Sequence, residues 1–278
     1  METETFALPD DAKRVSKTTV CIGGVNVYLY GVDELTPAQA EDTVVLILVH
    51  PRTRTYAYTE GMSHELVARE GGNRRGLVCL TFDARNHGAR MVSPLSNQSW
   101  SNGNETHGQD LMSLIDFTAA DVKMIMDFLP MYAPFTVSKY LCSGVSLGGH
   151  VVWRLLATDD RVQSAAPVVG CPRMTALLMT RLAKFLGAEP VGDSKEANAE
   201  LRKYLAAYDA GTAAITGKEI VIMNGSDDET VPDVFTKPWI EAHSAANTVT
   251  YLCQDGVGHK LTWRMMGMIA GWIHKSVE

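Results

Sequence analysis

The residues best suited to chemistry lie in one short segment, GVSLGG at residues 144–149, which fits the pattern G-x-S-x-G. An apolar, strand-like run precedes it, and a stretch with helical periodicity follows it. A sharp turn from strand to helix strains the main chain, and side chains beside the serine would clash there, so glycine is needed on both sides. The helix N-terminus also stabilises negative charge that develops nearby. This context predicts that Ser146 is a nucleophile.

A serine hydroxyl is a poor nucleophile at neutral pH, so it needs a histidine as base and an acid that orients the histidine. Of the eight histidines, His259 follows the last predicted strand, and glycines in the segment GVGH leave room for its ring to reach inward. The acid is expected after the predicted strand at residues 219–223. Three neighbouring carboxylates follow that strand, and the residues alone leave the choice between them open: Asp227, Asp228 and Glu229.

The elements that position these residues alternate between strand and helix. Short apolar runs without polar alternation predict strands buried on both faces, at residues 43–49, 76–82, 139–143, 165–169, 219–223 and 248–253. Apolar residues at helical spacing predict helices at residues 111–129, 147–157 and 260–275. Two β-rich runs within residues 17–30 predict an antiparallel hairpin at a sheet edge. Together these patterns predict one α/β domain over residues 1–278, with a mostly parallel sheet flanked by helices.

Three motifs resemble those of the α/β-hydrolase superfamily, and the resemblance covers the chain from about residue 43 onward. They are the turn at residues 144–149, the segment DARNHG at residues 83–88, which is similar to the family's D-x-R-G-H-G, and the G-x-x-D-x-x-V-P pattern at residues 225–232. The resemblance implies the α/β-hydrolase fold, and its register assigns the acid to Asp228 rather than Asp227. In this family the turn at residues 83–88 is structural, so we expect no chemical role for it.

The family forms its oxyanion hole from two main-chain N–H groups, one of which follows the nucleophile and here belongs to Leu147. The other comes from the loop after the third strand. Here the chain departs from the family's usual His-Gly, because Pro51 follows His50 and proline has no N–H, so Arg52 is the expected second donor. The side chains of Arg52 and Arg54 are expected at the surface, with contact to an anionic substrate group as the alternative.

Two helical segments, residues 174–186 and 195–208, interrupt the alternation and predict a small helical insertion at residues 172–211. In the family's arrangement such an insertion lies over the C-terminal ends of the strands as a cap. Its first helix carries a wide apolar band that includes Met174 and Leu178, and a long polar loop contains Trp100. We expect these three side chains to contact the substrate, with packing in the core as the alternative. A band that lines the pocket predicts a hydrophobic ester or lactone substrate.

Composition excludes several classes of protein. The 278 residues include 25 Lys+Arg and 32 Asp+Glu, which gives a formal net charge of −7, and no basic block suits a nucleic-acid partner. No apolar run is long enough to span a membrane. The five cysteines show no paired spacing, and the first residues lack a secretory signal, so we expect a cytoplasmic protein. Metal-ligand and nucleotide-binding motifs are missing, and we expect no metal and no cofactor.

The leading hypothesis is a serine hydrolase that cleaves a carboxylic ester, thioester or lactone through an acyl-enzyme. One alternative keeps the same triad for acyl transfer or for carbon–carbon bond hydrolysis, because the pocket selects the acceptor. The other alternative is a ligand-binding protein without catalytic activity on the same fold. The presence of Ser146, Asp228 and His259 together favours the enzyme.

Overall fold

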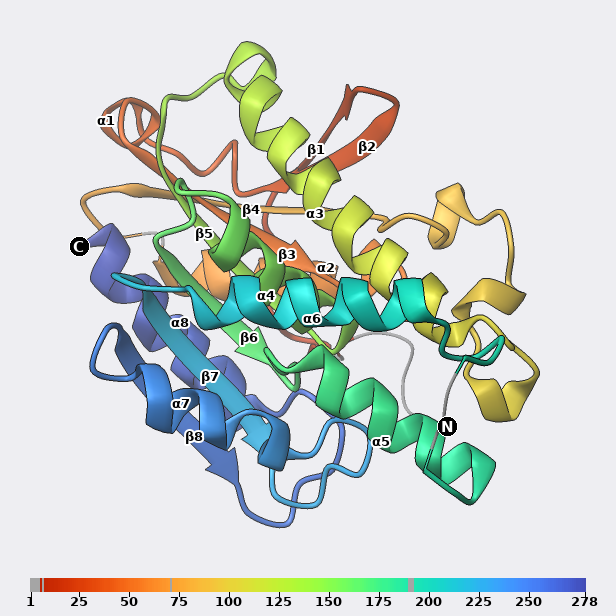
Figure 1. The fold of residues 1–278 in the computed structure, drawn as a ribbon. Helices are drawn as coiled ribbons and strands as arrows, with labels where there is room; N and C mark the ends of the chain where they lie inside the picture. The colour runs from red at the N-terminus through yellow and green to blue at the C-terminus, as the bar shows by residue number, and fades with distance from the viewer. Residues whose placement is uncertain (1–5, 7, 71, 190–192) are drawn as a thin grey trace.

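The computed structural model describes residue 6 and residues 8–70, 72–189 and 193–278. Eight strands form one sheet in the order β1-β2-β4-β3-β5-β6-β7-β8 (Figure 1). The pairs β1–β2 and β2–β4 are antiparallel, and every pair from β4 to β8 is parallel. The predicted α/β fold class, with its mostly parallel sheet, is therefore confirmed.

The strands are β1(Lys17–Ile22), β2(Val25–Tyr30), β3(Thr43–Val49), β4(Gly76–Phe82), β5(Val137–Val145), β6(Ser164–Val168), β7(Glu219–Gly225) and β8(Thr248–Gln254). The helices are α1(Pro37–Ala40), α2(Tyr56–Glu70), α3(His107–Tyr132), α4(Leu147–Thr158), α5(Met174–Leu186), α6(Ala199–Ala213), α7(Lys237–His243) and α8(Trp263–Val277). Short 3-10 turns are η1(Gly88–Arg90), η2(Leu95–Asn97), η3(Trp100–Asn102) and η4(Asp233–Phe235). Within the described ranges, no helix is long and apolar enough to cross a membrane.

The central strands are apolar throughout because helices cover both faces of the sheet. Every residue of β3 and β4 is buried. Val45 and Ile47 of β3 pack into the core formed with α3, α4 and α6, whereas Leu46 and Leu48 pack into the core formed with α2 and α8. Figure 1 shows the same two layers, with α3, α4 and α6 in front of the sheet and α8 behind it. Burial on both faces explains why these strands show no alternation of polar residues.

The predicted edge hairpin is present as β1 and β2. Its two-residue turn consists of Gly23 and Gly24, which both have positive φ. A turn with this conformation matches the twist of the two paired strands. Three helices, α1, α2 and α7, were not predicted from the sequence. The buried face of α2 includes polar and small residues such as Thr59, Gly61 and Ser63, so its apolar periodicity is weak.

The segment between β6 and β7 holds α5 and α6, as the broken alternation predicted, although α6 extends further toward β7 than expected. Helix α6 packs against both α4 and α5. The Tyr208 hydroxyl donates to the His150 carbonyl of α4 at 3.1 Å, and an Asp209 carboxylate oxygen accepts the Met174 N–H at the start of α5 at 2.7 Å. Figure 1 shows α5 on the side of the molecule toward which the β7 arrow points.

Helix α4 approaches the sheet so closely that its second residue must be glycine. A Cβ atom on Gly148 would lie 2.0 Å from the Val49 carbonyl oxygen at the end of β3, whereas a Cβ atom on Gly267 of α8 would meet nothing within 4 Å. The backbone carbonyl cannot move aside without displacing the strand. Close packing at Gly148 therefore fixes where α4, and the serine before it, sit over the sheet.

We predict opposite effects on stability for the same substitution at these two glycines. Gly148→Ala forces the main chains of α4 and β3 apart and should lower the free energy of unfolding by about 3 kcal/mol or more. Gly267→Ala, on the exposed side of α8, should raise it by about 0.5 to 1 kcal/mol, because alanine favours helix. Urea unfolding of both variants measures the difference. A Gly148→Ala protein as stable as the wild type would contradict this packing.

Candidate active site

Ser146 stands at the turn between β5 and α4 with a main-chain conformation that L residues rarely adopt. Its φ is 57° and its ψ is −110°. Its N–H donates to the Val168 carbonyl of β6 at 2.9 Å, which holds the turn against the neighbouring strand. A Cβ atom on Gly144 would lie 2.5 Å from the main chain of Gly148, so both flanking glycines are required. The predicted strand–turn–helix geometry around Ser146 is present.

Two short hydrogen bonds connect Ser146, His259 and Asp228 in series. The Ser146 hydroxyl lies 2.7 Å from His259 Nε2, and His259 Nδ1 lies 2.7 Å from Asp228 Oδ2. An ionised carboxylate only accepts hydrogen bonds, so the Nδ1 proton faces Asp228 and Nε2 is left to accept the serine proton. The structure thus brings the predicted nucleophile, base and acid together in the order that nucleophilic catalysis requires.

The environment of Asp228 keeps its carboxylate charged although the residue is buried. Burial alone would raise its pKa, but the hydrogen bond and charge of His259 and two main-chain N–H groups lower the pKa of Asp228 below its usual range. Those N–H groups, of Thr230 and Val231, each donate to Oδ1 at 2.8 Å. Asp227 is exposed and accepts a hydrogen bond from the Ser226 hydroxyl instead. Asp228, rather than its neighbour, is therefore the acid bonded to His259.

The loops that carry the acid and the base are packed against each other. The Asp227 N–H donates to the Val257 carbonyl at 2.9 Å. A Cβ atom on Gly225 would lie 2.1 Å from the same carbonyl oxygen. The loop after β7 and the loop after β8 thus approach closely only because glycine ends β7. This contact sets the separation of Asp228 and His259.

A cavity of about 430 Å³ opens over Ser146 and His259, a volume that suits a small organic ligand. Apolar and aromatic side chains form part of its wall: Phe6, Pro51, Tyr58, Val145, Leu261 and Trp263. Polar side chains form the rest: Arg52, Thr53, Arg54, Thr230, Lys260 and Thr262. Among the described residues, no group of three His, Cys, Asp or Glu side chains is arranged to hold a metal ion.

The two predicted oxyanion-hole residues lie next to this cavity. Leu147 begins α4 directly after the nucleophile, and Arg52 lines the cavity from the loop after β3. Within the described ranges, neither main-chain N–H donates to an acceptor in the protein. Buried His50 supports the loop, because its Nδ1 lies 2.8 Å from the Pro51 carbonyl and its Nε2 accepts the Ala84 N–H at 3.0 Å. Both N–H groups are therefore available to a ligand.

No protein-family model matches the sequence, and no curated protein sequence matches it either. Solved structures do match. A Thermus thermophilus protein, TT1662, superposes with a TM-score of 0.70 at 16% identity, over 96% of this chain and 99% of that one. The Pyrococcus furiosus esterase Pf2001 gives a TM-score of 0.62 at 14% identity, over 95% of this chain and 94% of that one. A Pyrococcus horikoshii acylaminoacyl peptidase gives 0.64 at 12% identity, over 95% of this chain but 41% of the peptidase.

The chain has the α/β-hydrolase fold. The turn at residues 83–88 has the structural contacts expected for this fold. The Asp83 carboxylate accepts the N–H groups of Tyr56 and Ala89, each at 2.9 Å, and so links the start of α2 to the turn itself. Arg85 forms an ion pair with Asp121 of α3 at 2.8 Å. These contacts attach the exit of β4 to the helices on both faces of the sheet.

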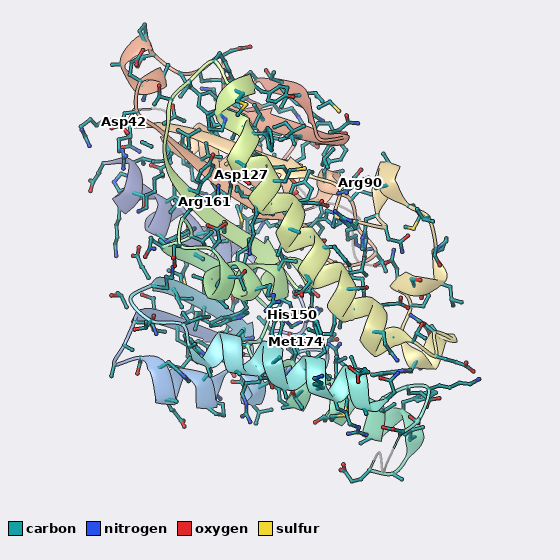
Figure 2. The ribbon with its side chains drawn as sticks, turned by 45° about the horizontal axis from the view of Figure 1, so that its top comes forward. Asp42, Arg90, Asp127, His150, Arg161 and Met174 are labelled. Atoms are coloured by element: carbon teal, nitrogen blue, oxygen red, sulfur yellow. The ribbon has the colours of Figure 1, made fainter. Side chains whose placement is uncertain are left out.

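The three residues predicted to contact substrate do not line the cavity at Ser146. Met174 and Leu178 are fully buried in the core between α4, α5 and α6, and Figure 2 shows Met174 near His150 in the interior of the view. Trp100 is buried, donates from Nε1 to the Glu105 carbonyl at 3.2 Å, and borders a second cavity of about 480 Å³. The structure thus favours the packing alternative for Met174 and Leu178, since the α5 helix uses its apolar band to attach itself to the core.

Several residues of the site were not predicted from the sequence. Phe6 and Trp263 lie far apart in the chain, yet their rings meet at a centroid distance of 4.7 Å in the cavity wall. Arg181 of α5 donates from Nη2 to the Thr230 carbonyl at 2.6 Å, next to the acid. These contacts bridge distant segments, and no local pattern encodes them.

Three histidines near the site are buried in the neutral form. Burial lowers the pKa of His50 to about 4, helped by the nearby ring of His87. Burial also lowers the pKa of His107 to about 3, with a contribution from the charge of Arg52, and that of His150 to about 3, with a contribution from Arg181. An unfolded histidine takes up a proton near pH 6.5. Between that pH and about 4, the unfolded chain therefore binds more protons than the folded chain.

We predict that stability falls as the pH is lowered from about 6.5 toward 4, by about 1.4 kcal/mol per pH unit for each of these histidines. Because the folded pKa is depressed, this contribution is fully present above the unfolded pKa and is lost on acidification. Urea midpoints between pH 4.5 and 7.5 measure the slope. The variant His107→Asn should show a shallower slope than the wild type, and a stability that stays flat down to pH 4.5 would refute the neutral assignment.

Proposed function

We propose that the protein is a serine hydrolase that cleaves a carboxylic ester, thioester or lactone through an acyl-enzyme. The observation that carries the proposal is the relay at the cavity floor, in which two hydrogen bonds of 2.7 Å join Ser146 to His259 and His259 to Asp228. A binding protein has no need for a serine held at a strained φ with a base on its hydroxyl. The fold shared with the named esterase is consistent with this assignment.

Each residue has a defined task in the proposed reaction. As the Ser146 oxygen attacks the carbonyl carbon, His259 Nε2 takes the hydroxyl proton, and Asp228 stabilises the imidazolium that forms. The carbonyl oxygen becomes negatively charged and accepts hydrogen bonds from the main-chain N–H groups of Leu147 and Arg52. The N-terminus of α4 lies beside it and further stabilises the negative charge. His259 then gives its proton to the departing alcohol or thiol. A water molecule, deprotonated by His259, releases the acid from Ser146 and restores the enzyme.

The cavity wall supports a small-molecule substrate with a hydrophobic part. With Met174 and Leu178 in the core, this preference rests on the apolar side chains that do face the cavity, which include Phe6, Leu261 and Trp263. We propose that the chain is one domain in which residues 172–211 act as a cap of limited size. The insertion's contact with the site is made through Arg181, which bonds to the loop that holds the acid.

The two adjacent aspartates provide a matched test of the relay. Asp228→Asn removes the charge that holds His259 in its working tautomer and should lower kcat for p-nitrophenyl butyrate by about 10³-fold or more. Asp227→Asn changes an exposed carboxylate that accepts a hydrogen bond from Ser226 of its own loop, so its kcat should stay within about twofold of the wild type. Far-ultraviolet circular dichroism of both variants confirms that they are folded.

The opposite ranking of the two variants, or equal activity in all three proteins, would contradict the assigned acid. The matching p-nitroanilide amide serves as the comparison substrate, because an acylaminoacyl peptidase shares the fold. We expect the ester to be cleaved faster than the amide. Turnover of the amide alone would overturn the ester assignment while leaving the triad in place.

A further inference from the structure

The charged residues that line the Ser146 cavity are opposite in sign to the net charge of the whole protein. The chain carries a formal net charge of −7, yet the described residues that line the Ser146 cavity include three cationic side chains and no carboxylate. The cations are Arg52, Arg54 and Lys260. In an acidic protein, a cavity whose charged lining residues are all cationic requires an explanation beyond average composition.

Arginines elsewhere in this protein are commonly paired with carboxylates. Ion pairs of 2.8 Å join Arg75 to Asp42 and Arg154 to Asp116, and Figure 2 labels Asp127 and Arg161, which pair at 2.6 Å. By contrast, no ion pair to Arg52 or Arg54 exists among the described residues. The arginines of the cavity therefore keep their charge unpaired inside the protein.

Arg52 is held in place by neutral groups. Its Nη1 donates to the Asn97 carbonyl at 3.0 Å. The His107 ring lies beside it, with Nδ1 at 3.3 Å from Nη1, but that Nδ1 donates to the Gln98 carbonyl at 2.8 Å. Burial lowers the pKa of His107 to about 3, so this ring carries no charge at neutral pH. Burial also lowers the pKa of Arg52 itself, which reflects the cost of removing an unpaired guanidinium from water. These contacts orient the side chain without neutralising it, and they leave its remaining N–H groups for another acceptor.

A further guanidinium adds positive charge behind the acid loop. Arg181 donates through Nε and Nη2 to the Thr230 carbonyl at 3.2 and 2.6 Å, and Thr230 lines the cavity. Burial lowers the pKa of Arg181 to about 10, and the positive charge of Arg52 contributes to that shift, so the two guanidinium groups lie within electrostatic reach of each other. No carboxylate among the described residues forms an ion pair with Arg181 either.

We propose that the substrate carries an anionic group, a carboxylate, which binds in the Ser146 cavity between the guanidinium groups of Arg52 and Arg54. This inference deepens the proposed hydrolase function and rests on it. Guanidinium groups present paired N–H donors whose geometry matches the two oxygens of a carboxylate, and that of Arg52 is preorganised by its contact with the Asn97 carbonyl. The apolar wall opposite, formed by residues such as Phe6 and Trp263, then holds the uncharged remainder of an amphipathic ester.

The anion can belong to either side of the scissile bond, and two pairs of substrates separate these cases. In the first pair, the acyl part carries the charge: p-nitrophenyl hydrogen adipate is compared with its methyl-capped form. In the second pair, the alcohol part carries it: p-carboxyphenyl butyrate is compared with its methyl ester. Each kcat/KM is divided by the rate of hydroxide hydrolysis of the same compound, which removes differences in intrinsic reactivity. The wild type should prefer the charged member of at least one pair by about tenfold or more.

Arg54→Gln tests the assigned residue, because its side chain lines the cavity and its main chain is not an assigned oxyanion donor. The charged-to-neutral ratio of kcat/KM should fall about tenfold in this variant, mainly through KM for the charged ester. Lys275→Gln removes one positive charge from the exposed end of α8 and serves as the control for general electrostatic attraction. Its ratio should stay within about twofold of the wild type.

The possible results separate the anion site from the hydrolase proposal. If the wild type hydrolyses none of the four esters, the hydrolase function itself is overturned. Activity with a charged-to-neutral ratio of one or less in both pairs would overturn the anion site alone. A wild-type preference that Arg54→Gln leaves unchanged would also overturn it. An equal loss on charged and neutral esters in Arg54→Gln would assign the arginine to the transition state or to structure, and would likewise contradict the proposal.

Discussion

The main chain of Ser146 is held in a left-handed conformation, with φ of 57°, and the rest of the site is built around that constraint. A residue other than glycine adopts this conformation only when its surroundings enforce it. Three contacts enforce it here. The Ser146 N–H donates to the Val168 carbonyl of β6. The main chain of Gly144 packs directly against that of Gly148, and Gly148 packs directly against the Val49 carbonyl at the end of β3. The serine is thereby fixed to three adjacent parallel strands, and its hydroxyl is directed away from the sheet toward His259.

Three kinds of ionisable side chain surround Ser146, and each has a different charge state. Asp228 is buried but charged, because His259 and two main-chain N–H groups surround its carboxylate. Buried histidines such as His150 are neutral. Arg52, Arg54 and Arg181 are positively charged, and none of them forms an ion pair with a carboxylate among the described residues. Thr230 links two of these groups, since its N–H donates to Asp228 and its carbonyl accepts from Arg181.

Much of this arrangement could be predicted from the sequence. The strands at residues 43–49 and 76–82 were predicted to the residue, because burial on both faces selects a mostly apolar run without polar alternation. The elbow glycines, Ser146 and His259 could also be predicted from their positions after strands, whereas the choice of Asp228 over its neighbours came from the family resemblance. Helix α2 was missed because it buries polar groups such as Thr59 and Ser63, which interrupt the apolar periodicity.

What the sequence could not show is which side chains meet across distant segments. The apolar band of α5 has the same pattern whether it lines a pocket or attaches the helix to the core, and the structure places Met174 and Leu178 in the core. Likewise, an unpaired arginine looks the same in sequence as a paired one. Only the fold shows that Arg52 and Arg54 line the same cavity as Ser146, whereas no Asp or Glu is among the described residues of that lining.

The most direct test of the account is whether folding activates Ser146. A fluorophosphonate should modify the native protein once per chain, and peptide mass spectrometry should place the adduct on Ser146, because His259 takes up the hydroxyl proton as the phosphorus is attacked. The same protein unfolded in urea should not react, since the relay no longer exists. Failure of the native protein to react, modification at another residue, or equal labelling of the unfolded chain would contradict the account.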